Sequence, residues 1–333
     1  MSDELLSAMG ELSERLERAR EMISRRFIGQ PDVIDLALVT LLSGGHALVV
    51  GVPGLGKTLL VDTIATVMGL SRNRIQFTAD LMPADILGSE VLRYREDGSR
   101  SFEFLRGPVF CQFLMADEIN RASPRTQSAL LEAMQDGQVS IDGSPIQLPR
   151  PFHVFATQNP VELEGTYPLP EAQQDRFMVQ INIDYPDFED EGRILLATTG
   201  ACEAEISPVF DTDALLRAQE VVRRIPVGEK IHGLILDTVR AGRPENHHRD
   251  QPADERVQLG PSTRAGQALM LAVRARALLN GRLAPGEEDV VEMAQPVICH
   301  RMKLNYAAMA KGERPEDIVR RLVTGKAESQ VVA

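Results

Sequence analysis

The chain has 333 residues, a length that predicts two domains at about 150 residues each. Its composition, with 43% hydrophobic and 25% charged residues, is typical of a globular protein, and its net charge of −12 disfavours a general nucleic-acid or anionic-membrane surface. Because the sequence shows no apolar run of membrane-spanning length, no signal-peptide pattern and no cysteine framework, we expect a cytoplasmic protein with buried free thiols at Cys111, Cys202 and Cys299.

The predicted elements begin with two helices. Apolar residues at helical spacing predict an amphipathic first helix, and these are Leu5, Met9, Leu12, Leu16, Ala19 and Ile23. Pro31 favours the first turn of a second helix, which the Ser-Gly-Gly stretch at 43–45 ends. Short apolar runs then alternate with helical stretches, and the runs lie at 47–50, 74–77, 112–116, 153–157 and 179–183. Five buried strands separated by helices predict a parallel sheet between two helical layers, a three-layer αβα domain.

Two hairpins and a short helix interrupt this alternation. Asp-Gly dipeptides at 97–98 and 142–143 each stand between runs of alternating polarity, which is a strong hairpin signal. Prolines at 168 and 170 predict a short helix over 171–177.

After residue 186 the strand pattern ceases, and residues 187–325 are predicted to be helical. The helical runs lie near 189–198, 211–224, 229–241, 263–279 and 287–302. A polar loop over 242–261 contains His247 and His248, for which solvation is favoured over metal binding because no further ligand is nearby in the sequence. We therefore place a domain boundary at 186, between an α/β domain (1–186) and an all-α domain (187–333).

The stretch GVPGLGKT at 51–58 matches the phosphate-binding pattern G-x-x-x-x-G-K-[ST], with an apolar strand before it and a helix after it. Its glycines let backbone N–H groups surround phosphate oxygens, Lys57 reaches the β- and γ-phosphates, and Thr58 offers its hydroxyl to Mg²⁺. A dinucleotide fingerprint is excluded because Leu59 stands where a glycine is required. The residues predicted to bind nucleotide here are Gly51, Pro53, Gly54, Leu55, Gly56, Lys57, Thr58 and Leu59.

Polar residues follow two later strands. Asp117 and Glu118 stand at the carboxyl end of the strand at 112–116, where open α/β sheets bind ligands. Asp117 would hold Mg²⁺ through water, and Glu118 would polarise the attacking water as general base; the alternative is a solvated acid pair. Asn159 could orient that water or contact the γ-phosphate, or it could be an ordinary turn asparagine.

For four arginines the sequence does not show which anion, if any, each side chain binds. Arg121, Arg125 and Arg264 lie near predicted helix starts, where a cation opposes the helix dipole unless an anion compensates. A solvated side chain is the alternative, which we favour for Arg121, leave open for Arg125 and disfavour for Arg264. Arg176 faces two uncharged residues on its short helix, so it has no obvious local partner; a salt bridge to Asp184 or to a distant acid is one explanation.

Four stretches resemble the MoxR family of AAA+ ATPases, which is related to the ATPase subunit of magnesium chelatase. They are GVPGLGKT, RIQFTADLMPADILG, ADEINRASPRTQSALLEAMQDGQV and ATQNPVELEGTYPLPEAQQDRF, and the resemblance runs over 27–302. It implies an αβα ATPase domain with strand order 5-1-4-3-2 and a helical lid. It also implies a homo-oligomeric ring, typically a hexamer, that binds ATP and Mg²⁺ at its subunit boundaries.

The resemblance also implies residue roles. Asn159 matches sensor 1, Arg264 matches the sensor-2 arginine, and Arg176 matches the arginine finger, whose anion would be the γ-phosphate held by a neighbouring subunit's Lys57. The adenine pocket falls on Phe27, Ile28 and Gln30. The two hairpins match the helix-2 insert and the pre-sensor-1 hairpin, which point toward the pore or a partner. The stretch GPSTRA departs from the Ser-Pro-Arg arrangement common in relatives, which leaves the register of sensor 2 open.

The function that follows is a chaperone-like ATPase ring that remodels or matures a protein partner. Family relatives assemble proteins or insert metal cofactors, commonly with a von Willebrand factor A-domain partner; this chain carries no such domain, so we expect a separate protein as partner. One alternative is a DNA-handling AAA+ machine, a helicase or a transcription activator, which the net charge and the absence of a GAFTGA loop disfavour. Another is a nucleotide-gated scaffold with little basal turnover.

Overall fold

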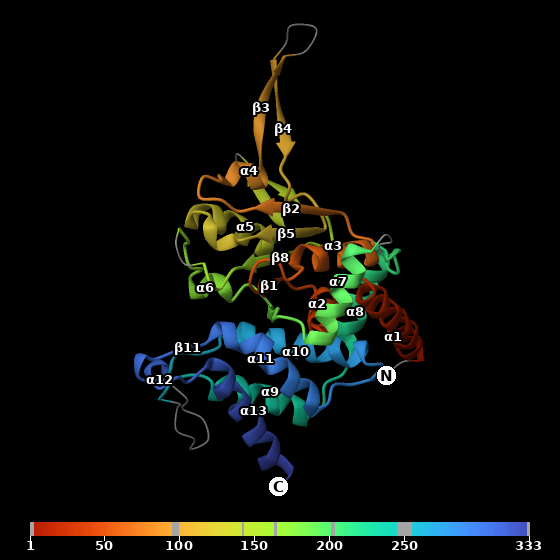
Figure 1. Cartoon of the computed structure of the whole chain (residues 1–333), viewed down its shortest axis with the longest axis vertical. Coiled ribbons are helices and arrows are strands. Elements are labelled where there is room, and N and C mark those ends of the chain that lie inside the picture. The colour runs from red at the N-terminus through yellow and green to blue at the C-terminus, as the bar shows by residue number, and fades with distance from the viewer. Residues whose placement is uncertain are drawn as a thin grey trace.

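The computed structural model describes residues 3–94, 100–141, 143–162, 165–200, 204–244 and 255–331, the last range with side chains to 324. Its centre is a five-stranded parallel sheet formed by β1 (Ala47–Val50), β2 (Arg72–Gln76), β5 (Phe113–Asp117), β8 (His153–Gln158) and β9 (Val179–Asn182). The strands lie in the order β2-β5-β8-β1-β9, and the first four of them are labelled in Figure 1. Counting these five strands along the chain gives the order 5-1-4-3-2, as the resemblance implies.

Helices cover both faces of this sheet, because successive side chains of each strand point to opposite faces. Phe113, Met115 and Phe155 belong to one hydrophobic cluster, with helices α1 (Asp3–Ser24), α2 (Pro31–Leu42) and α3 (Lys57–Val67). Leu114 and Ala116 belong to a second cluster, with α4 (Pro83–Leu87) and α5 (Pro124–Asp136). The three-layer αβα prediction is confirmed.

Two antiparallel hairpins extend from this core as predicted. Strands β3 (Gly88–Tyr94) and β4 (Arg100–Arg106) form the longer hairpin, which projects from the body of the molecule (Figure 1). Strands β6 (Gln138–Ile141) and β7 (Ser144–Gln147) form the shorter one, with Gly143 in the left-handed region at φ 78°. The predicted turn residues 97–98 and Asp142 lie outside the described residues.

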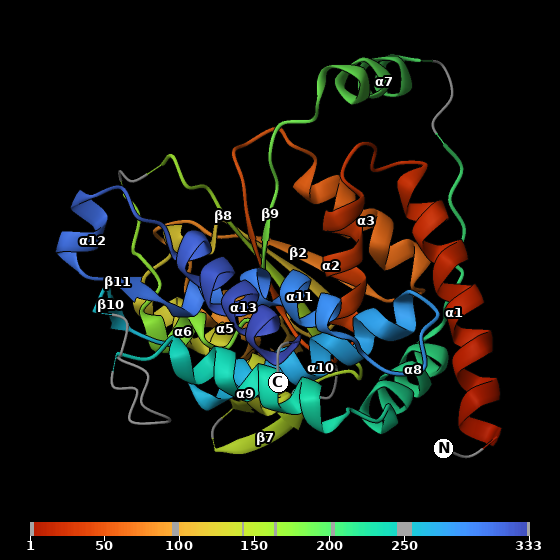
Figure 2. The ribbon, with the colours of Figure 1, turned by 90° about the horizontal axis from the view of Figure 1, so that it is seen from below.

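The helices after the sheet form the second part of the chain. They are α7 (Phe188–Thr199), α8 (Thr212–Arg224), α9 (Glu229–Ala241), α10 (Thr263–Leu279), α11 (Glu287–Ile298), α12 (Tyr306–Ala310) and α13 (Pro315–Val331), with a 3₁₀ turn η2 (Cys299–Arg301). Helix α7 stands apart from the other helices and buries none of its residues (Figure 2). Helix α10 packs on α1 and α2, and one hydrophobic cluster continues from the sheet into α10, α11 and α13. The division at 186 therefore stays a prediction.

Three predictions about elements were wrong. The strands do not cease at 186, because β10 (Val257–Leu259) pairs with β11 (Lys303–Leu304) beside the helices. The α-helix predicted near 287–302 ends at Ile298, and the next three residues form the 3₁₀ turn η2. The helix predicted over 171–177 is α6 (Glu171–Gln174), after which the chain continues in tight turns with N–H groups bonded three residues back.

Two of the predicted buried thiols, Cys111 and Cys299, are buried and free, while Cys202 lies outside the described residues. Burial raises the pKa of Cys111 to about 12, so this thiol stays protonated at neutral pH. His247 and His248 also lie outside the described residues. Within the described ranges, no helix combines the length and the apolar character needed to cross a membrane.

Candidate active site

The phosphate-binding loop connects β1 to α3 in a conformation that requires glycine. Gly54 and Gly56 have φ values of 88° and 75°, in the left-handed region that side chains disfavour. A Cβ on Gly51 would lie 2.7 Å from the carbonyl oxygen of Ile183, so only glycine fits beneath the loop. The loop leads directly into the first turn of α3 at Lys57, where unpaired N–H groups attract anions.

Lys57 faces the acidic pair that follows β5. Its Nζ donates a hydrogen bond to the carbonyl oxygen of Gly51 at 2.7 Å. Burial lowers the pKa of Lys57, and the nearby Asp117 and Glu118 act in the opposite direction. The structure therefore brings together the three charged residues that the sequence predicted for one site.

Asp117 is buried at the carboxyl end of β5, and both of its oxygens have partners on neighbouring strands. The hydroxyl of Thr157 donates to Oδ1 at 2.5 Å, and Nη2 of Arg74 lies 2.6 Å from Oδ2. Sequence reasoning missed Arg74 and Thr157, because both lie in stretches identified only by their apolar neighbours. The parallel order β2-β5-β8 places them beside Asp117.

Glu118 has a strained backbone and a tethered carboxylate. Its φ of 55° makes it the single non-glycine residue with positive φ in the described part of the chain, as is common at functional sites. Nε2 of Gln76 donates to Glu118 Oε2 at 2.9 Å, and Nε of Arg121 does so at 2.7 Å. The expectation that Arg121 is merely solvated was wrong, since its guanidinium also pairs with Glu162 at 2.5 Å.

Asn159 follows β8 and is buried in a turn, as expected for the alternative of an ordinary turn asparagine. Its Oδ1 accepts the N–H of Val161 at 3.2 Å, and its Nδ2 donates to Glu162 at 3.3 Å. Glu162 thus links Asn159 to Arg121 and onward to Glu118. Arg125 is exposed in the first turn of α5 and has no hydrogen bond or ion pair with any residue described in the structure, so its role stays open.

The segment predicted to form the adenine pocket lies beside the phosphate-binding loop. A Cβ on Gly56 would come within 3.4 Å of the ring of Phe27, which is buried. Nε2 of Gln30 donates to the carbonyl oxygen of Asp184 at 3.1 Å, next to the end of β9, and Ile28 is half-buried between them in the chain. The geometry places this segment where a base attached to loop-bound phosphates could lie, and its role stays a prediction.

Arg176 and Arg264 lie at the opposite end of the sheet from Lys57. Strands β1 and β9 are parallel, with Ala47 paired to Val179 at their amino ends. The phosphate-binding loop follows the carboxyl end of β1, whereas Arg176 precedes β9. A cleft of about 300 Å³ at the amino ends is lined by four arginines and one carboxylate, which are Arg176, Arg223, Arg264, Arg301 and Asp175. This cleft is therefore a basic surface.

Arg176 is held without an ion pair. Its Nη1 donates to the carbonyl oxygen of Leu131, and its Nε is buried with no hydrogen-bond partner. The alternative of a salt bridge to Asp184 was wrong, because that residue follows the other end of β9, and no acid among the described residues pairs with Arg176. Arg264 is half-exposed beside it, with Nη1 3.8 Å from Asp175 Oδ2. The candidate finger and the candidate sensor-2 arginine thus share one cleft.

Comparisons with known proteins cover most of the chain. Residues 46–179 match the model of the ATPase family associated with various cellular activities (AAA), and residues 249–322 match that of the AAA lid domain. The chain is 42% identical to Chaperone MoxR1 of Mycobacterium tuberculosis over 96% of its length and 83% of that protein. It is 40% identical to YeaC of Bacillus subtilis, over 94% of its own length and 95% of that protein. A crystal structure of a candidate ATPase from Cytophaga hutchinsonii superimposes with a TM-score of 0.87 at 36% identity, covering 96% of each chain.

Proposed function

Because the chain belongs to the MoxR family of AAA+ ATPases, we propose that it hydrolyses ATP at the boundaries between subunits of a ring and uses this turnover to remodel a protein partner. One observation carries the proposal. Lys57 and the acidic pair lie at the carboxyl ends of the strands, while Arg176 lies at the amino ends in a basic cleft. A ring that joins these two ends of neighbouring subunits would complete each site.

The phosphate-binding loop and Lys57 would hold the triphosphate of ATP. The site also suits Mg²⁺, which needs only one or two protein oxygens besides phosphate and water. Asp117 supplies a carboxylate at the end of β5, and Thr58 supplies a hydroxyl in the first turn of α3. Bound Mg²⁺ would neutralise charge on the β- and γ-phosphate oxygens.

Glu118 would act as the general base and Asn159 would orient the attacking water. In the single chain Gln76 and Arg121 both donate to Oε2 of Glu118, and these bonds hold the carboxylate in one orientation and weaken that oxygen as an acceptor of a proton from water. This tether is the specific observation that favours the second candidate, a nucleotide-gated scaffold with little basal turnover. Both candidates use the same site and differ in the rate without a partner.

Arg176 would stabilise the γ-phosphate held by the neighbouring subunit, with Arg264 beside it. An arginine supplied in this way raises the rate of P-loop enzymes by about 10³ to 10⁵. We propose a hexamer in the cytoplasm, in which residues 187–333 act as the lid of an ATPase domain formed by residues 1–186. A DNA-handling machine fits less well, because the net charge is −12.

The partner would be a separate protein. The name of the relative Chaperone MoxR1 supports a role in protein maturation. We propose that the client or adaptor carries a von Willebrand factor A domain and that the maturation step includes metal-cofactor insertion. Co-purification from the source cells, with and without a non-hydrolysed ATP analogue, would show whether such a protein associates with the ring.

Mixing two inactive variants tests the shared site. Glu118→Gln subunits lack the base but still offer Arg176, and Arg176→Ala subunits lack the finger but keep Lys57, Asp117 and Glu118. We expect Glu118→Gln alone to hydrolyse ATP at least about 10²-fold more slowly, and Arg176→Ala alone at least about 10³-fold more slowly. The mixture of the two variants should regain activity. Subunit exchange is followed by fluorescence transfer between labelled subunits. Exchange without recovered activity would overturn the shared site.

A further inference from the structure

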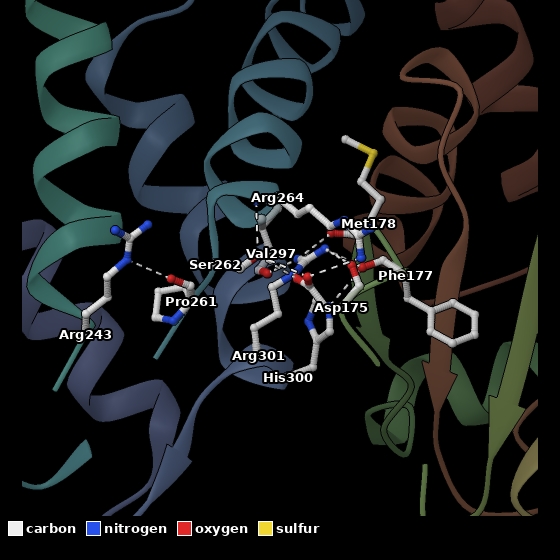
Figure 3. Close-up of polar contacts among 10 residues, drawn as sticks. All are labelled: Asp175, Phe177, Met178, Arg243, Pro261, Ser262, Arg264, Val297, His300 and Arg301. Carbon is white, nitrogen blue, oxygen red and sulfur yellow. Dashed lines mark hydrogen bonds and ion pairs between the residues drawn. The ribbon is translucent and has the colours of Figure 1, made fainter. Parts of the chain in front are cut away.

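Arg301 lies in η2, at the end of α11, and its side chain is only 3% exposed. Its guanidinium points at the segment 175–178, which carries Arg176 from α6 into β9 (Figure 3). The two residues that meet, Arg301 and Asp175, are 126 positions apart in the sequence. The lid is therefore bonded directly to the chain on either side of the candidate finger.

All five N–H donors of Arg301 have an acceptor. Nε donates to Asp175 Oδ1 at 2.8 Å, and Nη2 donates to the carbonyl oxygens of Phe177 at 2.6 Å and of Asp175 at 3.2 Å. Nη1 donates to the carbonyl oxygen of Met178 at 3.0 Å and to that of Val297. Three of these carbonyls come from the residues that flank Arg176, so the backbone there has little freedom to move.

Asp175 extends this bonding to Arg264. Besides Arg301, its carboxylate accepts a hydrogen bond from Oγ of Ser262 at 3.0 Å and lies 3.8 Å from the Arg264 guanidinium. Ser262 is the N-cap of α10, where its Oγ accepts the N–H of Arg264 (Figure 3). Two of the four arginines of the cleft, Arg176 and Arg264, are thus connected to Asp175 and Arg301 through one network of bonds.

We propose that Arg301 is the positioning residue of the active site formed across the subunit boundary: it holds the backbone of Arg176, and through Asp175 the start of α10, so that both cations face the neighbour's phosphates. This inference rests on the proposed function. Arg301 itself is buried and does not touch the phosphates. Its guanidinium geometry matters more than its charge, because a lysine presents three donors from one atom and cannot reach the same five acceptors.

The test variant is Arg301→Lys, which keeps the positive charge and loses the planar arrangement of five N–H donors. A displacement of about 1 Å at a catalytic group can cost about 10²-fold in rate. We therefore expect kcat for ATP hydrolysis to fall about 10²-fold, while ATP affinity stays within about 2-fold because the subunit's own phosphate-binding loop is untouched. The matched control is Arg276→Gln. Arg276 pairs with the buried Asp289 and makes no bond to the segment 175–178, and Asp289 keeps Arg282 as a partner when Arg276 is replaced. We expect this variant to retain nearly full activity.

Mixing separates positioning from a folding defect. Arg301→Lys subunits keep Lys57, Asp117 and Glu118, so Glu118→Gln subunits with an intact Arg176 should restore their activity in mixed rings. If Arg301→Lys does not fold, Asp175→Asn takes its place, with a smaller loss expected and the same recovery on mixing.

Full activity of the folded variant alone would overturn the proposal. A second contradicting outcome is that Arg301→Lys regains no activity when it is mixed with Glu118→Gln, although Arg176→Ala mixed with Glu118→Gln does. The defect of Arg301→Lys would then lie in its own nucleotide site and not in the arginine that it offers to its neighbour. If neither pair recovers although subunits exchange, the shared site itself is wrong, and the role of Arg301 fails with it.

Discussion

The change Glu118→Gln should separate ATP binding from hydrolysis. Glutamine keeps the size and hydrogen-bonding oxygen of glutamate, so Gln76 and Arg121 can still donate to it. The side chain makes no hydrogen bond or ion pair with the phosphate-binding loop in the described chain, and its partner Arg121 is half-exposed, so neither ATP affinity nor folding should change much. The loss is the carboxylate that accepts a proton from water.

Loss of a general base typically slows a reaction by about 10² to 10⁴, which corresponds to about 3 to 5 kcal/mol of transition-state stabilisation. The assay compares the affinity for a fluorescent ATP analogue with the rate of phosphate release. Glu287→Gln is the matched control, because it removes one charge from a paired carboxylate, that of Glu287 with Lys230, outside the network of Glu118. We expect a small effect from this control. Nearly normal hydrolysis by Glu118→Gln would refute the assignment of Glu118 as the base.

Three further outcomes follow from the site and the fold. Lys57→Ala should abolish ATP binding in a titration with a fluorescent analogue, and retained affinity would contradict phosphate capture by Lys57. Burial lowers the pKa of His46 and His300 to about 3 and that of His153 to about 4, below the unfolded value of about 6.5, so the unfolded chain binds protons first as pH falls. Stability should be full above about pH 6.5 and fall toward pH 4, by at most about 1.4 kcal/mol per pH unit for each histidine, and equal urea midpoints at about pH 7.5 and pH 5 would argue against this. DNA binding should be weak, and sub-micromolar affinity at physiological salt with ATP present would instead support a helicase.

The sheet could be predicted because each of its strands is a short apolar run, and the order of the strands came from the family resemblance. The pairing of Val257–Leu259 with Lys303–Leu304 could not, since strands of three and two residues show no periodicity and form only when distant segments meet. The early end of α6 has a similar cause. Arg301 bonds the carbonyls after Gln174 from another part of the chain, and no local pattern contains that contact.

The site was predictable where a motif is local and was missed where it depends on neighbouring strands. GVPGLGKT and the acidic pair carry their chemistry in consecutive residues. Arg74, Gln76 and Thr157 reach Asp117 and Glu118 only because β2 and β8 flank β5. Arg121 was misjudged, although one partner, Glu118, stands only three residues before it; the other, Glu162, reaches it only when the turn after β5 meets the loop after β8.

A structure of the Glu118→Gln protein with ATP and Mg²⁺ tests the central claim most directly. The quantity to measure is the distance from the Arg176 guanidinium to the nearest γ-phosphate. The account predicts a ring in which this distance is about 3 Å, to a nucleotide held by the neighbouring subunit's Lys57. A nucleotide whose γ-phosphate is contacted only by residues of its own chain, with Arg176 turned away from every phosphate, would contradict it.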